Sequence, residues 1–132
     1  MEKYLGVKLI EAEPQVMQDG VTPISVKEGY KVIYPDGYVS WSPKTVFEEA
    51  YRRIDNLPFG LAVEALKKGY KVARKGWNGK DMYITLIPAG NAMFQGYPMQ
   101  DCFGLKTNNS QMQPGWVPSI RDVLAEDWVI VE

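Results

Sequence analysis

The chain has 132 residues, of which 45% are hydrophobic and 23% are charged, and its formal net charge is −1 at pH 7. This composition is typical of a soluble globular protein with one core, or with one core and a small added module, and it excludes a disordered chain. The balanced charge argues against a general binder of DNA, RNA or membranes, and the absence of histidine excludes Ser-His-Asp and Cys-His nucleophiles.

Residues 1–56 are predicted to form a β-β-α extension. Residues 3–14 read as an extended stretch, and residues 15–29 as a polar loop that contains glycine and proline. Two short runs of aromatic and β-branched residues follow on either side of Pro35-Asp36-Gly37, whose residue types are typical of a tight turn.

A helix is predicted over residues 43–54. Its apolar residues recur at helical spacing, and Ser42 followed by Pro43 is a common sequence for an N-cap and a first helical position. The polar, proline-containing stretch at 55–58 is expected to end this helix.

Residues 57–132 are predicted to form a second region, which opens with the helix FGLAVEALKKG, in which Gly69 follows the C-cap. A short helix is predicted from Ser119 to about Glu126, and a long loop over 88–101. Strands are predicted at 70–74, 82–87, 102–106 and 128–131. The predicted fold class is therefore α+β, a small antiparallel sheet packed with short helices.

Trp77, Asn78 and Gly79 lie in the most basic stretch of the chain, between two predicted strands. Asn-Gly is the strongest short-range signal for a hairpin, so one interpretation is a turn in which Trp77 folds onto the sheet. The other is a binding surface. An indole stacks on a nucleobase with about 1–3 kcal/mol per base, and Arg74 with the neighbouring lysines would hold phosphate oxygens.

Ser119, Arg121 and Asp122 stand at the start of the last predicted helix. A hydroxyl and an acid three residues apart form a capping box, which accounts for Ser119 and Asp122 without any ligand. The alternative is that this helix start faces a phosphate or a ribose, and that Asp122 accepts a hydrogen bond from a ribose hydroxyl or an adenine amine.

The remaining aromatic and sulfur-containing residues predict packing rather than chemistry. Tyr83, Phe94, Tyr97 and Phe103 are expected in the core or against loops, and Cys102 is expected to be a buried small hydrophobe.

No metal or cofactor site is expected, because the sequence has no glycine-rich phosphate loop, no CxxC pair and no HExxH motif. A single cysteine excludes an intrachain disulfide and fits a reducing cytoplasm. No segment has the character of a signal peptide or a membrane span, so we expect neither export nor insertion.

Four motifs in residues 57–132 resemble those of the second-type Thoeris anti-defense family of small phage-encoded proteins. They stand here as FGLAVEALKKG, RKGWNG, WVPS and DVLAEDW. The resemblance implies a sponge rather than an enzyme. Such a protein is a homotetramer in the host cytoplasm that binds, without cleaving, a cyclic ADP-ribose-type nucleotide (1''-3' glyco-cyclic ADP-ribose) made by a bacterial TIR-domain NADase. Some relatives also accept cyclic dinucleotides.

The resemblance also implies a ligand site between subunits. Trp77 and Asn78 of one chain would meet Ser119–Asp122 of another, with Gly79, Arg74 and Tyr83 as further ligand contacts. Where the family usually has Ser-Gln-Thr-Asp, this chain has Ser119-Ile120-Arg121-Asp122, so Arg121 would replace the lost contacts with one to a phosphate.

Residues 1–56 lie outside this match, and the stretch GYKVIYPDGYVSWSPKTVFEEAYR within them, residues 29–52, is similar to a short module of other phage and prophage proteins. Two other functions stay open beside the sponge. One is an accessory module that binds another protein through exposed aromatic loops. The other is an enzyme that hydrolyses the messenger, with Asp122 or Glu126 as the base.

Overall fold

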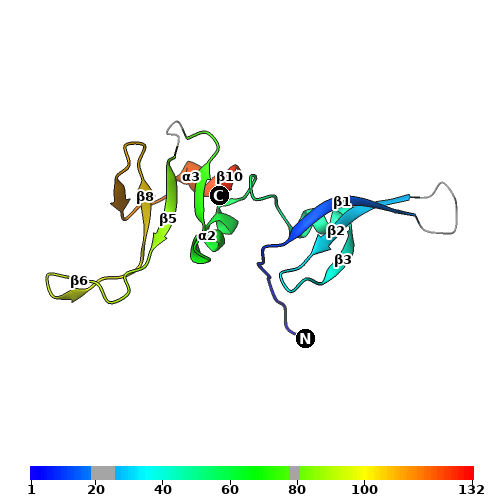
Figure 1. Cartoon of the computed structure of the whole chain (residues 1–132), viewed down its shortest axis with the longest axis horizontal. Helices are drawn as coiled ribbons and strands as arrows, with labels where there is room; N and C mark the ends of the chain where they lie inside the picture. The colour runs from blue at the N-terminus through cyan, green and yellow to red at the C-terminus, as the bar shows by residue number, and fades with distance from the viewer. Residues whose placement is uncertain (19–25, 78–80) are drawn as a thin grey trace. The chain divides into compact units, whose positions relative to one another are not determined.

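The structure is a computed structural model that describes residues 1–18, 26–77 and 81–132. The chain divides into two compact units, Met1–Arg52 and Arg53–Glu132. Each unit combines an antiparallel sheet with short helices, which confirms the predicted α+β class (Figure 1). None of the helices in the described residues is long and apolar enough to cross a membrane.

The N-terminal unit is a three-stranded sheet followed by one helix. Strand β1 (Glu11–Gln18) pairs with β2 (Val26–Ile33), β2 pairs with β3 (Val39–Pro43), and α1 (Lys44–Ala50) follows. The order β2-β3-α1 is the predicted β-β-α arrangement, to which β1 adds a strand.

The polar loop predicted over residues 15–29 is wrong at both of its ends. Residues 15–18 and 26–29 pair with each other in the β1–β2 ladder, where backbone hydrogen bonds do not require apolar side chains. The rest of the predicted loop lies outside the described residues.

The turn between β2 and β3 has the geometry that its sequence predicts. Gly37 has a φ of +89°, a conformation that glycine adopts at little cost, and its N–H donates to the Tyr34 carbonyl at 2.8 Å. The Asp36 carboxylate accepts from the Tyr38 N–H at 3.0 Å and closes the turn.

Helix α1 begins one residue later than predicted and ends four residues earlier. Pro43 is the N-cap in place of Ser42, and it supplies no side-chain cap. The helix ends at Ala50, where Arg52 folds back and its Nη1 donates to the Glu48 carbonyl at 2.7 Å. That bond satisfies a carbonyl that a helix C-terminus leaves without an intrahelical partner.

The C-terminal unit is a five-stranded antiparallel sheet, in the order β10-β4-β5-β8-β9, with two helices. Its main elements are α2 (Phe59–Lys67), β4 (Lys71–Arg74), β5 (Tyr83–Ile87), β8 (Cys102–Lys106), β9 (Met112–Pro114), α3 (Ile120–Leu124) and β10 (Trp128–Val131). The four predicted strands are confirmed, β9 was not predicted, and α3 ends two residues before Glu126. Gly69, with a φ of +93°, follows the C-cap Lys68 of α2 as expected.

The predicted loop over 88–101 contains a small hairpin, β6 (Met93–Phe94) paired with β7 (Tyr97–Pro98). Phe94 and Tyr97 are 65% and 74% exposed, so the expectation that they pack in the core or against loops is wrong. Cys102 is half-buried rather than buried, and Phe103 packs against the core.

The core of this unit lies between α2 and one face of the sheet. Helix α2 contributes three buried side chains at helical spacing, Ala62, Ala65 and Leu66. The other buried residues of the core are Leu57, Val72, Ile84 and Trp128.

Candidate functional site

Trp128, the first residue of β10, is the centre of an aromatic cluster. Its side chain is fully buried, and its Nε1 donates to the Asp122 carbonyl at 2.9 Å. The rings of Phe59, Trp77 and Trp116 surround it, with centroid separations of 5.5, 5.6 and 6.1 Å. These contacts fix the end of the sheet where the predicted site residues lie.

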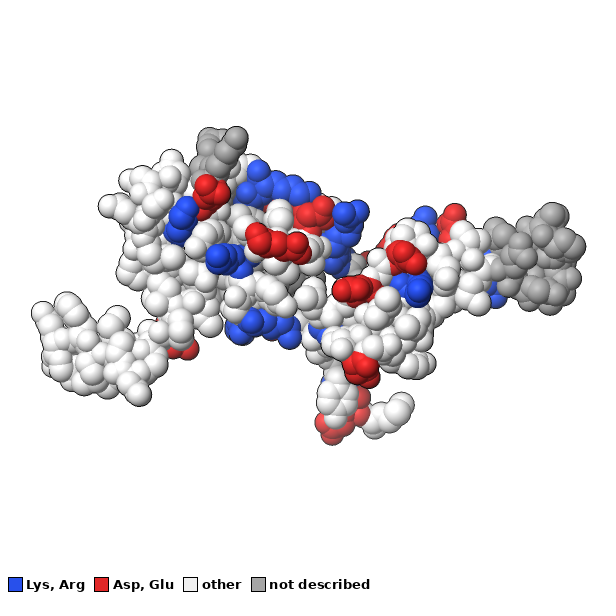
Figure 2. All heavy atoms as spheres, in the orientation of Figure 1, with Lys and Arg blue, Asp and Glu red and all other residues white. Residues whose placement is uncertain are grey.

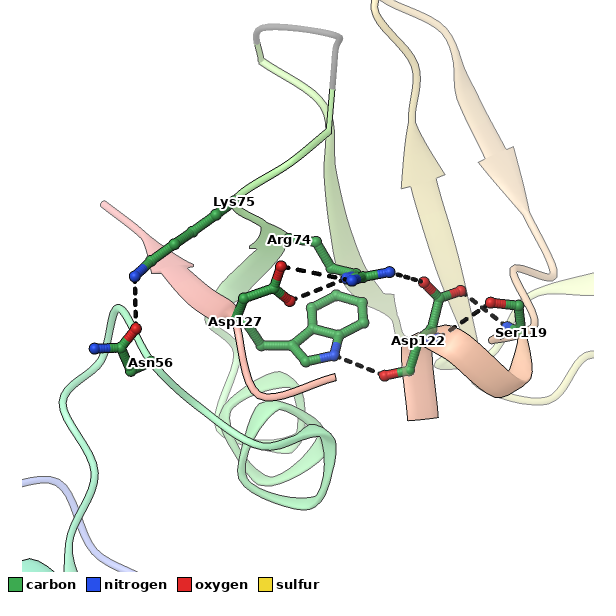
Figure 3. Close-up of polar contacts among 7 residues, drawn as sticks. Asn56, Arg74, Lys75, Ser119, Asp122 and Asp127 are labelled. Atoms are coloured by element: carbon green, nitrogen blue, oxygen red, sulfur yellow. Dashed lines mark hydrogen bonds and ion pairs between the residues drawn. The ribbon is translucent and has the colours of Figure 1, made fainter. Parts of the chain in front are cut away.

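Arg74, the last residue of β4, is directly opposite Trp128 in the sheet. Its Nε lies 3.0 Å from Asp127 Oδ1 and its Nη2 lies 3.5 Å from Asp127 Oδ2, while its Nη1 lies 3.2 Å from Asp122 Oδ1. Figure 3 shows the guanidinium between the two carboxylates. Arg74 therefore ties the start of β10 to α3.

Asp122 and Ser119 form the predicted capping box at the start of α3. The Ser119 N–H donates to Asp122 Oδ2 at 2.8 Å, and the Asp122 N–H donates to Ser119 Oγ at 3.1 Å (Figure 3). The structure thus brings Arg74, Ser119 and Asp122 together, and it gives each of them a partner within the chain.

The charges in this cluster stabilise one another. Burial of Asp122 acts to raise the pKa of its carboxyl, but its hydrogen bonds with Ser119 and its contact with Arg74 outweigh burial, so this pKa lies below the ordinary value. The hydrogen bond to Asp127, supported by the one to Asp122, raises the pKa of the Arg74 guanidinium. Asp122 is therefore ionised at neutral pH and acts only as an acceptor.

Trp77 lies half-buried against the core, with its ring nearly perpendicular to that of Trp128 at 77°. Its N–H donates to the Arg74 carbonyl at 3.2 Å. Asn78 and Gly79, the other two residues of the predicted turn, lie outside the described residues. Trp77 and Asp122 both contact Trp128, so the two residues lie near each other within a single C-terminal unit. The predicted contact of Trp77 with Ser119–Asp122 of another subunit stays a prediction.

Tyr83 lies on the other face of the sheet. It precedes the buried Ile84 in β5, and neighbouring residues of a strand point to opposite faces. Its ring centroid is 4.7 Å from Lys71 Nζ and 5.9 Å from Lys106 Nζ. The structure therefore does not bring Tyr83 to the cluster of Arg74 and Asp122, but places it between two cations.

Two further cations flank the cluster. Arg121 is exposed on α3, and Lys75 follows β4 and donates from Nζ to Asn56 Oδ1 at 2.5 Å (Figure 3). Both side chains reach solvent beside Arg74 and Asp122, and both can contact an anion.

Two residues of this site were not predicted from the sequence as part of it. Asp127 is the bidentate partner of Arg74, and Trp128 organises the aromatic cluster. Both residues belong to the DVLAEDW motif, so the sequence did contain a signal for them. The contact of Asp127 with Arg74, however, follows from strand pairing between segments 53 positions apart.

Asp122 is poorly suited to act as a general base. A carboxylate with a lowered pKa is a weak general base, and the sequence contains no histidine to share protons with it. In residues 1–18, 26–77 and 81–132, no cluster of three acidic or cysteine side chains could hold a metal ion. The site offers aromatic surface, exposed cations and hydrogen-bond acceptors.

Comparisons with known proteins place residues 57–131 in a recognisable domain. The sequence model of the Thoeris anti-defense 2-like domain matches this range. The chain is also similar to Thoeris anti-defense 2 of Bacillus phage SP01, with 42% identity over 86 residues, which cover 57% of this chain and 94% of that protein.

Proposed function

Since the chain belongs to the Thoeris anti-defense 2-like family, we propose that it is a phage sponge, which binds a cyclic ADP-ribose-type signalling nucleotide (1''-3' glyco-cyclic ADP-ribose) without cleaving it. Sequestration of this messenger in the host cytoplasm keeps the Thoeris effector inactive. The observation that carries the proposal is the match over residues 57–131, which spans the aromatic cluster and the Arg74–Asp122 contact.

Trp77 supplies the stacking surface for the adenine in this proposal. The contact with Trp128 holds its ring in one orientation, and because the ring is only half-buried, part of it reaches solvent. A ring that is already oriented loses little side-chain entropy when a base stacks on it.

The polar residues around Trp77 supply the remaining contacts. Asp122, ionised and acceptor-only, accepts from a ribose hydroxyl, and the exposed Arg121 contacts the pyrophosphate. Arg74 holds Asp122 in place through their ion pair at 3.2 Å, and the exposed Lys75, which follows it, adds positive charge for the phosphates. Ser119, Asn78 and Gly79 complete the ligand contacts, and the binding form is a homotetramer.

Tyr83 supports an extension of the proposal to cyclic dinucleotides. It lies with Lys71 and Lys106 on the opposite face of the sheet, where an aromatic ring between two cations suits a base and a phosphate. This second contact surface is separate from the Trp77 cluster.

The test is calorimetry of the full chain with 1''-3' glyco-cyclic ADP-ribose and with an isomer of different linkage. We expect Trp77→Ala to weaken binding by about 5- to 150-fold, because stacking contributes about 1–3 kcal/mol. Trp41→Ala, which removes a half-buried tryptophan of the N-terminal unit, is the matched control and should leave the affinity unchanged.

The fate of the nucleotide separates the sponge from its two alternatives. After binding, the protein is heat-denatured and the released nucleotide is analysed by mass spectrometry. Recovery of intact messenger supports the sponge. Recovery of a hydrolysed product supports an enzyme that uses Asp122 or Glu126, and no retained nucleotide supports a protein-binding module. Either of the last two results contradicts the proposal.

A further inference from the structure

The turn between β2 and β3 forms one side of an open hollow on the N-terminal unit. The hollow has a volume of about 440 Å³, which is within the range of small-ligand sites. It is lined by Lys8, Tyr34, Pro35, Asp36 and Tyr38. All five residues belong to the unit Met1–Arg52, outside the range 57–131 that matches the family, so the hollow is separate from the site described above.

The backbone of this turn holds two tyrosine rings in place. The Tyr34 N–H donates to the Tyr38 carbonyl at 2.9 Å, and Asp36 Oδ1 accepts from the Tyr38 N–H at 3.0 Å. The rings of Tyr34 and Tyr38 stack with their centroids 5.9 Å apart and an interplanar angle of 23°. The hollow therefore has a preformed aromatic wall beside a carboxylate, whose Oδ2 is a second acceptor.

Lys8 places a cation in this hollow. Its Nζ lies 4.2 Å from the centroid of the Tyr34 ring, within the ~6 Å limit of a cation–π contact. The structure describes residues 1–10 without helix or strand, and in this stretch Tyr4 and Leu5 are 90% and 98% exposed. A cation–π contact at an exposed site contributes little, so Lys8 is a weakly held occupant that another cation can replace.

A guanidinium group fits the hollow more fully than the ammonium of Lys8 does. A guanidinium is planar, so it stacks on a tyrosine ring, and its fork of N–H donors pairs with both oxygens of a carboxylate. The hollow offers these two partners together, in Tyr34 and Asp36. An ammonium is a compact point charge that cannot make the planar contact.

The charge of the surrounding unit also favours a basic partner. Residues 1–52 contain eight acidic and six basic residues, so the acids exceed the bases by two. Figure 2 shows acidic side chains, in red, exposed on this unit. Opposite charge increases the rate at which a basic segment of another protein meets this surface.

We propose that the hollow docks an arginine side chain of a partner protein, and that Lys8 occupies the hollow when this partner is absent. As the arginine enters, Lys8 leaves the Tyr34 ring, and the guanidinium stacks on Tyr34 and donates to Asp36. The N-terminal unit is then an interaction module carried beside the family domain. None of its docking residues is a proposed nucleotide contact, so the two proposals are independent and can fail separately.

The test titrates the full chain with N-acetyl-arginine amide and follows the ring protons of Tyr34 and Tyr38 by NMR. Lys8→Met keeps a long side chain without its charge and should bind this probe about 2- to 5-fold more tightly, because the competing cation is gone. Tyr34→Leu removes the stacking ring and should bind it about 5- to 30-fold more weakly. Asp36→Asn keeps the oxygen that accepts from Tyr38 but removes the charge, and should weaken binding about 2- to 5-fold.

Analogues of the probe separate arginine recognition from simpler contacts. N-acetyl-citrulline amide has the shape of the arginine probe without its charge and should not shift the rings. N-acetyl-lysine amide carries the charge without the planar fork and should bind more weakly than the arginine probe. Equal binding of either analogue would overturn the proposal.

Two control variants test whether the effects are specific to this hollow. Tyr34→Phe keeps the ring and should bind the arginine probe like the wild type, whereas Tyr70→Leu removes an exposed tyrosine of the C-terminal unit and should change nothing. Thermal melting should confirm that every variant folds. The proposal is wrong if the arginine probe leaves both rings unshifted, or if Tyr34→Leu binds it as tightly as Tyr34→Phe does.

Discussion

The two units of this chain are stabilised in different ways. In the described residues of the C-terminal unit, the core has seven buried side chains, one of which is the fully buried Trp128. In the described residues of the N-terminal unit, the buried core is the single side chain of Val32, and α1 buries none. The difference indicates that the domain shared with the family carries its own stability, since burial of apolar area is the main favourable term in folding.

The N-terminal unit depends instead on its sheet and on stacked rings. Tyr30, Phe47 and Tyr51 stack in a row, with centroid separations of 4.1 and 4.9 Å. Trp41 crosses the sheet, where its Nε1 donates to the Gln15 carbonyl at 3.0 Å and its ring leaves no room for a Cβ at Gly29. Such a unit gains little from burial and should open at a lower free energy.

The largest effect is expected from Trp128→Ala. Removal of a fully buried tryptophan should cost about 3–5 kcal/mol and leave Phe59, Trp77 and Trp116 without their common partner. Hydrogen exchange should show loss of amide protection in α2, β4 and β10. Protection in β2 should persist, and its simultaneous loss would show that the two units do not fold independently.

The next effect is expected from Val32→Ala, in the N-terminal unit. Deleting two buried methyl groups should cost about 2 kcal/mol, and amide exchange should rise in β1 to β3 only. Val39→Ala, in the same sheet but 50% exposed, is the matched control and should cost much less. Equal effects of the two substitutions would mean that Val32 is not the core of this unit.

A smaller effect is expected from Ser119→Ala, which removes the side-chain half of the capping box. The cost should be about 1 kcal/mol, measured as a shift of the urea unfolding midpoint of the C-terminal unit. Ser40→Ala, a half-buried serine outside any helix cap, serves as the comparison. Equal shifts for both substitutions would contradict a capping role for Ser119.

The same contrast explains what could be predicted from the sequence. The elements of the C-terminal unit follow from local signals, such as the helical spacing of Ala62, Ala65 and Leu66 and the glycine after α2. In the N-terminal unit, many residues of β1 and β2 are polar, so the alternation of apolar and polar residues that predicts a strand is weak. The sequence therefore predicts a loop at Gln15, which lies in β1.

The candidate site shows the same limit. The capping box of Ser119 and Asp122 is local and was predicted from a spacing of three residues. The contact of Arg74 with Asp127 joins strands far apart in the sequence, and no local pattern encodes it. Whether Trp77 packs on the sheet also depends on Trp128, which only the tertiary structure brings near.

The smallest expected effect is a difference between the two units in how their stability depends on pH. The pKa of Asp122 is lowered in the folded state, so ionised Asp122 adds to the free energy of unfolding. This stabilisation is complete above the unfolded-state pKa of about 3.9, and it is lost as the pH falls through the folded-state pKa. The hydrogen bond to Glu48 raises the pKa of Tyr30, so the protonated Tyr30 hydroxyl adds to the free energy of unfolding. This stabilisation is complete below about pH 10 and is lost at higher pH. Acid should therefore destabilise the C-terminal unit first, and alkali the N-terminal unit.

Segment-resolved hydrogen exchange during a pH series, corrected for intrinsic exchange rates, measures both trends. Tyr30→Phe removes the hydroxyl and should abolish the alkaline loss in β2 while leaving the acid loss in α3 unchanged. Asp122→Asn should do the reverse, because an amide does not titrate. If either substitution altered both trends, the two units would be coupled, and the independence inferred from their separate cores would not hold.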